Sequence, residues 1–491
     1  MPLTRRDLDG TAALTAAGFL LTGTVGALAT APGALAAQEA SEAASGDAGE
    51  APGYGPLLPD PAGVLALPAG FSYRIITHSG VTTLESGEHT PSRHSGTAAF
   101  EGPRGATLLV NNHALSGPRS DADRPVPLTG GLVHDPAAAG GCTVVEARPG
   151  GGMTERTALA GTCANRAGGS TPWGTSLSCE GNAVLAGQGG MTKDHGYVFE
   201  VDPHERHADQ TPRPVKAFGR YAHEAVVFDP RTGYVYLTEN ASGPNGLFYR
   251  WVPPHGFTHG RGRLRGLADD AGLLQAPRCF DAGGRFVDDL SRAVRPGTVY
   301  GVDWVDVPDR DARTVDVRRQ FPEGDVTRAR KLEGMWWADG GAYFVSAYAR
   351  DAYAPDTTPD GRPYDGQVWF YSPRRRTLTL KVLISVPGDP GQGGAFDGPG
   401  HITVSPSGGL VVAADRAGRR HLFGATEHGR TYPVARNDLN GDAFTGAVFS
   451  PDGRTLYASL GSPGLMLAIT GPWRRSPQRP KTSWRRPQLL L

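Results

Sequence analysis

Residues Val226–Glu239 read V-V-F-D-P-R-T-G-Y-V-Y-L-T-E, two apolar runs separated by a short turn. Proline at the second turn position fixes φ, and the glycine near the end of the turn accepts a positive φ. Each apolar run has the length of a strand. The stretch therefore predicts a β-hairpin.

The same pattern returns along the chain. Ile402–Asp415 reads I-T-V-S-P-S-G-G-L-V-V-A-A-D, and Ala447–Leu460 reads A-V-F-S-P-D-G-R-T-L-Y-A-S-L. Shorter versions lie at Gly102–His113 and Met335–Ala347. The two long copies begin 45 residues apart, close to the roughly 40–50 residues of a four-stranded propeller blade. The repeat predicts an all-β chain, a β-propeller of five or six blades with loop insertions. A β-sandwich or a β-helix is the alternative.

Composition agrees with a turn-rich globular fold. The 491 residues include 49 Lys+Arg and 49 Asp+Glu, so the formal net charge is zero. This balance argues against a nucleic-acid binder that relies on a broad basic field. Hydrophobic residues make up 39%, which excludes a disordered chain. The 69 glycines and 41 prolines indicate many turns and short strands.

Residues 1–36 predict an export signal. Arg5 and Arg6 precede a weakly apolar segment that ends in the A-x-A signal of Ala34–Ala36, a pattern typical of the twin-arginine route. Asp9 is atypical for that route, and a transmembrane anchor is the alternative. We expect the twin-arginine export machinery as a partner, an extracytoplasmic location and no stable membrane anchor.

The rest of the chain divides into three parts. Residues 37–56 are rich in Ala, Glu, Ser, Gly and Pro, and predict a disordered linker. We assign residues 57–473 to the propeller. Residues 474–491 form a basic, proline-rich tail, which is either solvated or in contact with anionic polymers of the cell envelope.

Cysteine spacing excludes two classes of protein. The four cysteines are Cys142, Cys163, Cys179 and Cys279. They form no C-x-x-C pair, which argues against zinc-ribbon and thioredoxin-like proteins. One or two disulfides are compatible with an oxidising compartment.

Polar residues appear where the second strand of each predicted hairpin ends. They are Asn111-Asn112-His113, Glu239-Asn240, Ser346, Asp415 and Ser459. A propeller directs equivalent strand positions toward one axial channel, so oxygen donors distant in sequence converge there. Such convergence suits a hard cation, which takes six to eight oxygen ligands. The alternative is that these side chains cap loops.

Two segments contain residues that suit metal binding. In Pro172–Glu180, P-W-G-T-S-L-S-C-E, Cys179 next to Glu180 is either a thiolate metal ligand or a buried structural cysteine. In Gly219–Asp229, G-R-Y-A-H-E-A-V-V-F-D, His223 precedes Glu224. Because neighbouring strand residues point to opposite faces, we expect one of these two to enter the channel.

A third segment is R-K-L-E-G-M-W-W, Arg330–Trp337, in which Glu333 precedes a glycine and an aromatic run. Glycine at this place would let a ligand or a metal approach the backbone.

Together these segments resemble the PhoX-type alkaline phosphatases, a family of exported bacterial proteins. The resemblance runs from about Asn111 to Trp473, most of the chain after the linker. It implies a six-bladed propeller that carries iron and calcium ions at one end of its channel and hydrolyses phosphomonoesters. The metal ligands that it implies here are Cys179, Glu224, Glu333, Asp415, Asn112 and Glu239. Lys331 stands where the family has an arginine that assists at the phosphate; it keeps the charge and loses the bidentate fork. Lys331 and Glu333 are the implied catalytic residues.

Several carboxylates of the family pattern are replaced in this chain. The family has two glutamates after the cysteine, and here Glu180 is followed by Gly181. It has Thr-Glu-Asp where this chain has Thr238-Glu239-Asn240. Further differences fall at Ala114, Gly400, Ala414 and Ala443. Losing a carboxylate removes both a bond to the metal and a compensating charge, so we expect incomplete calcium sites.

Three functions are compatible with these observations. The first is a metal-dependent phosphomonoester hydrolase that clusters cations to neutralise phosphoryl oxygens and activate water. The second is a catalytically degenerate propeller with a binding or sensory role. The third is a calcium-dependent esterase or lactonase, since propeller channels host several hydrolytic chemistries.

Overall fold

The structure of the protein is a computed structural model. It describes residues 53–120, 123–206, 212–293, 295–347, 366–384, 398–406, 408–414, 421–426 and 430–473. The expected export signal, almost all of the expected linker and the basic tail lie outside these ranges. All of the described residues belong to one compact unit, Pro52–Leu491.

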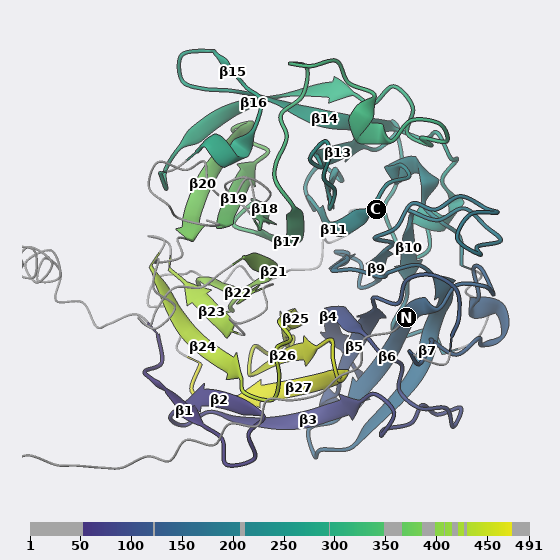
Figure 1. Cartoon of the computed structure of the whole chain (residues 1–491), viewed down its shortest axis with the longest axis vertical. Helices are drawn as coiled ribbons and strands as arrows, with labels where there is room; N and C mark the ends of the chain where they lie inside the picture. The colour runs from purple at the N-terminus through teal and green to yellow at the C-terminus, as the bar shows by residue number, and fades with distance from the viewer. Residues whose placement is uncertain are drawn as a thin grey trace, which may run out of the picture. The chain divides into compact units, whose positions relative to one another are not determined.

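The described residues form antiparallel sheets (Figure 1). One sheet holds β4 (His94–Glu101), β5 (Thr107–His113), β6 (Gly140–Ala147) and β7 (Met153–Thr162). The next holds β8 (Gly169–Ser170), β9 (Ser176–Cys179) and β10 (Val198–Val201). A ten-stranded sheet begins with β11 (His223–Phe228), β12 (Val235–Glu239), β13 (Phe248–Val252), β14 (Leu273–Phe280) and β16 (Val299–Asp306), with the short β15 (Phe286–Val287) paired to β14 off this path. It continues with β20 (Thr377–Ile384), β19 (Gly366–Ser372), β18 (Gly341–Ser346) and β17 (Leu332–Ala338).

The N-terminal strands complete the last two sheets. One consists of β21 (Pro399–Val404), β22 (Leu410–Ala414), β23 (His421–Ala425), β24 (Thr431–Asn437), β2 (Leu65–Pro68) and β1 (Leu57–Pro59). The other consists of β25 (Phe444–Phe449), β26 (Thr455–Leu460), β27 (Leu465–Thr470) and β3 (Ser72–His78). Pairing β2 with β24 and β3 with β27 joins the two ends of the described chain. This pairing covers edges of β24 and β27 that would otherwise invite aggregation.

The first strands of the sheets contact one another in a closed cycle, in the order β4, β8, β11, β17, β21, β25 and back to β4. Figure 1 shows β4, β11, β17, β21 and β25 around a common centre, with later strands of their sheets outside them. This arrangement confirms the all-β propeller and rules out the sandwich and the β-helix. The number of blades stays a prediction, because strand pairing joins two of the strand groups into the one ten-stranded sheet.

The predicted hairpins are confirmed as the inner strand pairs of these sheets. Val226–Glu239 corresponds to β11 and β12, and its turn is held by Asp229, which accepts from the backbone N–H of Arg231 and from the Thr232 hydroxyl. Gly233 has a φ of +73° in that turn, a conformation that favours glycine. The other two long copies correspond to β21–β22 and β25–β26.

Apolar side chains fill the space between neighbouring sheets. Phe248 and Phe344 stack across two strand groups with ring centroids 4.7 Å apart, and Trp251 and Trp369 are fully buried. Within the described ranges, helix is confined to short 3-10 segments: Pro103–Gly105, Gly130–Leu132, Lys216–Phe218, Leu264–Gly266, Leu290–Arg292 and Val317–Arg319. In the same ranges we find no helix with the length and apolar character needed to cross a bilayer.

Candidate functional site

Five of the inner strands share an irregularity at one end. Near the start of each of these strands, the register of its pairing with the following strand shifts by one residue. The shifts lie between His94 and Thr97 in β4, His223 and Val226 in β11, Leu332 and Met335 in β17, Pro399 and Ile402 in β21, and Thr445 and Val448 in β25. A bulge of this kind leaves extra residues unpaired and re-aims their side chains, and bulges are common next to active sites. The repeated bulge therefore marks one end of the ring of inner strands as the place where side chains converge.

Glu224 and Glu333 occupy the first bulged position of β11 and β17, two inner strands in contact with each other. Both are buried. The side-chain amide of Asn240, which follows β12, donates to Glu224 Oε2 at 3.3 Å and to Glu333 Oε1 at 3.0 Å. One amide nitrogen thus links two carboxylates that are 109 positions apart in the sequence.

Lys331 lies at one end of this linked pair. Its Nζ is 3.3 Å from Glu333 Oε1, and its side chain is 29% exposed. The residue has a φ of +47°, in the left-handed region that non-glycine residues rarely adopt. Such conformations persist where the surrounding structure imposes them, often at functional sites.

Arg166 lies at the other end. Its Nε is 3.9 Å from Glu224 Oε2, and its side chain is 43% exposed. Its backbone N–H donates to the Cys179 carbonyl at 2.9 Å, and its carbonyl accepts from Asn112 Nδ2 at 2.8 Å. Arg166 therefore contacts three of the residues that the sequence indicated as metal ligands.

Asn112 is held on both sides of its amide. Its Oδ1 accepts from the Ser178 hydroxyl at 2.7 Å, while its Nδ2 donates to the Arg166 carbonyl. Asn112 thus fixes the segment that carries Arg166 and lies at the same end of the channel as Glu224.

Cys179 ends β9 and is fully buried. Burial raises the pKa of its thiol well above the usual value, and the charges of Glu224 and Glu180 raise it further. The thiol is therefore protonated at neutral pH in the absence of a cation. Each of the four cysteines is free, so the disulfides that the sequence left open do not form.

His223 and Glu224 point to opposite faces, as expected. The His223 ring packs on Tyr221 with centroids 3.7 Å apart, and its Nε2 lies 3.1 Å from the Gly219 carbonyl. Burial lowers the pKa of His223 to about 3, so the ring is neutral. Glu224 alone of this pair enters the cluster.

The Glu180 carboxylate is held by a histidine and by backbone N–H groups. His195 Nδ1 is 2.5 Å from Glu180 Oε1, and the backbone N–H groups of Gly196 and Tyr197 donate to Oε2. On its other side, His195 Nε2 is 3.3 Å from Asp135 Oδ2. His195 is thus enclosed between two buried carboxylates, which form a structural clamp around its ring.

Glu239 is separated from the Glu224–Glu333 pair. Tyr249 donates to its Oε2 at 2.8 Å, and Arg318 Nη1 is 3.2 Å from its Oε1. Burial raises the pKa of Glu239, while Arg318 and Tyr249 act in the opposite direction. Its neighbour Asn240 contacts Glu224 and Glu333 instead, and a metal-binding role of Glu239 stays a prediction.

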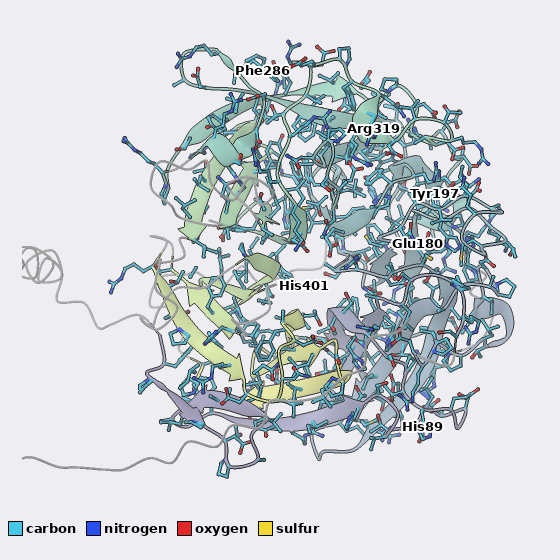
Figure 2. All side chains as sticks on the ribbon, in the orientation of Figure 1. His89, Glu180, Tyr197, Phe286, Arg319 and His401 are labelled. Atoms are coloured by element: carbon cyan, nitrogen blue, oxygen red, sulfur yellow. The ribbon has the colours of Figure 1, made fainter. Side chains whose placement is uncertain are left out.

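Gly334 has a role different from the expected one. A Cβ at this position would lie 3.0 Å from the Cα of His401 and 3.0 Å from the backbone nitrogen of Ile402. The glycine thus lets strand β21, not a ligand, approach β17 closely. His401 Nδ1 accepts from the backbone N–H of Gly446 at 3.0 Å, and Figure 2 shows His401 near the centre of the ring of strands.

The donor set can be tested against the implied metals. Asp415 lies outside the described residues. Within the described ranges, no three His, Cys, Asp or Glu side chains are arranged to hold a metal ion. Glu224, Glu333 and the amide oxygen of Asn240, once the amide is rotated, fit a single hard cation.

Sequence analysis assigned no role to Arg166, and it marked Asn240 as a strand-end residue and as a departure from the family pattern. The available signal was weak. Arg166 is a lone cation in the small-residue run Ala164–Ser170. Gly181 is the second part of that signal, because a Cβ there would lie 2.5 Å from Arg166 Nε.

Comparisons with known proteins identify the family of this chain. The family model for Alkaline phosphatase PhoX matches residues 52–156 and 151–464. Among solved structures, PhoX of Pseudomonas fluorescens in complex with vanadate, a transition state analogue, is similar with a TM-score of 0.62 at 16% identity. The similarity covers 85% of this chain and 97% of that chain.

Other matches are more distant. A putative gluconolactonase matches with a TM-score of 0.37 at 11% identity, over 84% of this chain and 96% of that one. A virginiamycin B lyase from Staphylococcus aureus matches with a TM-score of 0.37 at 10% identity, over 82% and 99%. No curated protein matches. Since the family model spans most of the sequence, this chain belongs to the PhoX alkaline phosphatase family.

Proposed function

We propose that this protein is an exported hydrolase of phosphomonoesters that depends on a hard cation bound between Glu224 and Glu333. The observation that carries the proposal is the link between these two buried carboxylates through Asn240. Membership of the family supports the reaction class.

Charge explains why a cation is needed. Glu224 and Glu333 balance Arg166 and Lys331, so the four groups together offer no net positive charge to a phosphate dianion. A bound cation would polarise the phosphoryl oxygens and lower the pKa of a bound water molecule. Calcium suits the two carboxylates and the amide oxygen of Asn240.

The protein's own groups would then orient the substrate. Lys331 is partly exposed beside Glu333 and can reach a phosphoryl oxygen from solvent. The imposed backbone conformation of Lys331 fixes where its side chain starts. Lys331 would therefore position the phosphoryl group and stabilise charge that develops on it.

Iron is the second metal of the proposal, with Cys179 as its soft ligand. The raised pKa of the buried thiol means that iron would have to displace a proton to bind. Arg166 supports this assignment, because its backbone N–H donates to the Cys179 carbonyl while its side chain lies beside Glu224. Asp415 and Asn112 are further ligands implied by the resemblance.

One experiment tests the function. The purified protein is analysed for calcium and iron, and hydrolysis of an aryl phosphate is followed from pH 6 to 11 with both metals added. We expect bound metal and calcium-stimulated hydrolysis that is faster at alkaline pH. Absence of turnover under all these conditions would reject the proposal.

A second function is favoured by a specific observation. Glu224 and Glu333 both accept from Asn240, and each also lies beside a cationic side chain, so their negative charges are compensated without a metal. This is the arrangement expected of a catalytically degenerate propeller that binds a ligand. Metal content below one ion per chain, together with absent turnover, would support it.

A further inference from the structure

Glu224 and Glu333, which Asn240 links, are flanked by two cationic side chains, Arg166 and Lys331. Only Lys331 has a role in the proposed reaction. We propose that Arg166 is a second phosphoryl-binding residue, and that Glu224 restrains it until a cation occupies that carboxylate. This inference rests on the proposed function and adds a residue that grips the substrate.

The backbone of Arg166 is fixed in place. Its N–H and carbonyl are both used by neighbours, Cys179 and Asn112. The preceding Asn165 is also held, because its Oδ1 accepts from Thr162 and its Nδ2 donates to Ser178. The side chain therefore starts from a rigid point, as a residue that orients a substrate requires.

The stem of Arg166 packs where Gly181 has no side chain. A Cβ at position 181 would lie 2.5 Å from Arg166 Nε and 2.6 Å from its Cγ. Any larger residue at 181 would force Arg166 to move. The glycine thus allows the guanidinium to lie beside Glu224.

The interaction between Arg166 and Glu224 is incomplete. Arg166 Nε is buried and has no hydrogen-bond partner in the described part of the chain. The nearest carboxylate oxygen, Glu224 Oε2, is 3.9 Å away, beyond hydrogen-bond distance. Meanwhile 43% of the Arg166 side chain is exposed. The guanidinium is held near Glu224 by charge and remains able to turn toward an anion.

Arginine suits this task because its planar fork matches two oxygens of a phosphate. With Glu224 free of metal, its negative charge both attracts Arg166 and repels an incoming phosphate. When Glu224 binds a cation, both effects weaken. Phosphate binding and cation binding are therefore coupled, and each raises the affinity for the other by the same factor.

Calorimetric titration of the full-length mature protein with inorganic phosphate, with and without calcium, tests this inference. For the wild type we expect phosphate to bind at least about tenfold more tightly with calcium. Arg166→Met should lose most of this gain. Glu224→Gln should bind phosphate more tightly than the wild type without calcium, because Arg166 is released and a negative charge is removed. Calcium should then add little.

Arg313→Met is the matched control. Arg313 has a similarly exposed side chain, 55%, and pairs with the Asp194 carboxylate in a different ion pair. Its substitution should leave phosphate binding unchanged. Thermal unfolding of each variant establishes that it is folded before titration.

The outcomes separate the two proposals. If the wild type binds phosphate with calcium and Arg166→Met binds it equally well, Arg166 has no such role and the inference fails alone. If the wild type binds no phosphate with calcium and hydrolyses no aryl phosphate, the proposed function fails with it. Weaker phosphate binding in metal-free Glu224→Gln than in the metal-free wild type would contradict the restraint by Glu224.

Discussion

Glu224 and Glu333 occupy the same bulged position in adjacent inner strands, and one amide group, that of Asn240, donates to both. Because a bulge re-aims the side chain that it carries, the repeat of one backbone irregularity brings two distant glutamates together. The equivalent bulges in β21 and β25 carry Gly400 and Gly446 at this position. The carboxylates are therefore concentrated on one side of the channel end.

Asn240→Asp should create a stronger calcium site. In this variant a carboxylate replaces the amide that donates to Glu224 and Glu333, and it places a third negative charge beside theirs. Without metal, the variant should therefore be less stable than the wild type by about 1–3 kcal/mol. Calcium would relieve this repulsion and stabilise the native state by mass action. Thermal unfolding should therefore show a larger calcium-induced rise in Tm for Asn240→Asp than for the wild type.

The control for that variant is Asn245→Asp, which adds the same charge to the same loop after β12. The Asn245 backbone carbonyl accepts from Arg328, and this contact does not involve its side chain. An equal calcium response in both variants would show that added charge alone, and not a site at Glu224 and Glu333, is responsible.

Cys179→Ala should reduce the amount of bound iron, while its stability should fall no more than that of an equivalent variant at another buried cysteine. Both Cys179 and Cys142 are fully buried, so removal of either sulfur should cost a similar, small free energy of unfolding, about 1 kcal/mol. Elemental analysis should show iron loss in Cys179→Ala and unchanged iron in Cys142→Ala. Equal iron content in the two variants would leave Cys179 as a core residue only.

Enclosure of His195 between Glu180 and Asp135 predicts a pH-dependent stability. Burial by itself lowers the pKa of His195, but its hydrogen bonds and charge interactions with Glu180 and Asp135 raise it overall. The stabilisation of the folded state by protonated His195 is therefore fully present below the pKa of histidine in the unfolded chain, about 6.5. It is lost as the pH rises through the pKa of His195 in the folded state. His134, which packs against His195 edge to face, adds a small opposing charge when protonated.

Chemical denaturation of His195→Gln at pH 6 and pH 9 measures this effect. The variant should lose more stability relative to the wild type at pH 6 than at pH 9. His89→Gln, at an exposed position that Figure 2 labels, should show no such difference. A loss for His195→Gln that is the same at both pH values would mean that the ring is neutral in the clamp.

Export can be tested separately from the fold. Replacement of Arg5 and Arg6 by lysine should retain the protein inside the cell, because the twin-arginine route requires the arginine pair. Cell fractionation followed by immunoblotting measures the distribution. Normal export of the double variant would indicate a general secretory signal instead.

The sequence was a good guide to the fold because hairpins are local. The turn chemistry of Asp229 and Gly233 lies within a few residues of the strands that it joins, so pattern alone was sufficient. The closed ring depends on contacts between distant strands, which the repeat suggested but could not count. Bulges leave no mark in the apolar pattern, so the shared position of Glu224 and Glu333 was invisible.

The site was only partly predictable for the same reason. Glu224 and Glu333 were found through motif resemblance, whereas Arg166 belongs to a segment without a recognisable pattern. Its position depends on Asn112, Cys179 and Gly181, each from a different part of the sequence. Glu239 and Asn240 are adjacent but contact different partners, Tyr249 and Arg318 in one case and Glu224 and Glu333 in the other, which the polar strand end alone could not show.

Activity of Glu333→Gln and Lys331→Met gives the most direct test of the proposed reaction. Glu333→Gln keeps the size of the side chain and removes the charge that would hold a cation. We expect kcat to fall by more than about 100-fold, since even residues that only support a metal ligand are worth about 10–100-fold. Lys331→Met should mainly weaken binding of substrate and transition state, and so lower kcat/KM more than kcat. Steady-state kinetics with an aryl phosphate measures both.

Glu146→Gln is the control. Glu146 is a partly buried carboxylate in β6, on a different sheet from Glu333, and it pairs with Arg148. Its substitution should leave both constants unchanged. If Glu333→Gln retains wild-type kcat while its bound calcium is unchanged, the carboxylate pair is not the cation site, and the reaction must use groups elsewhere in the channel.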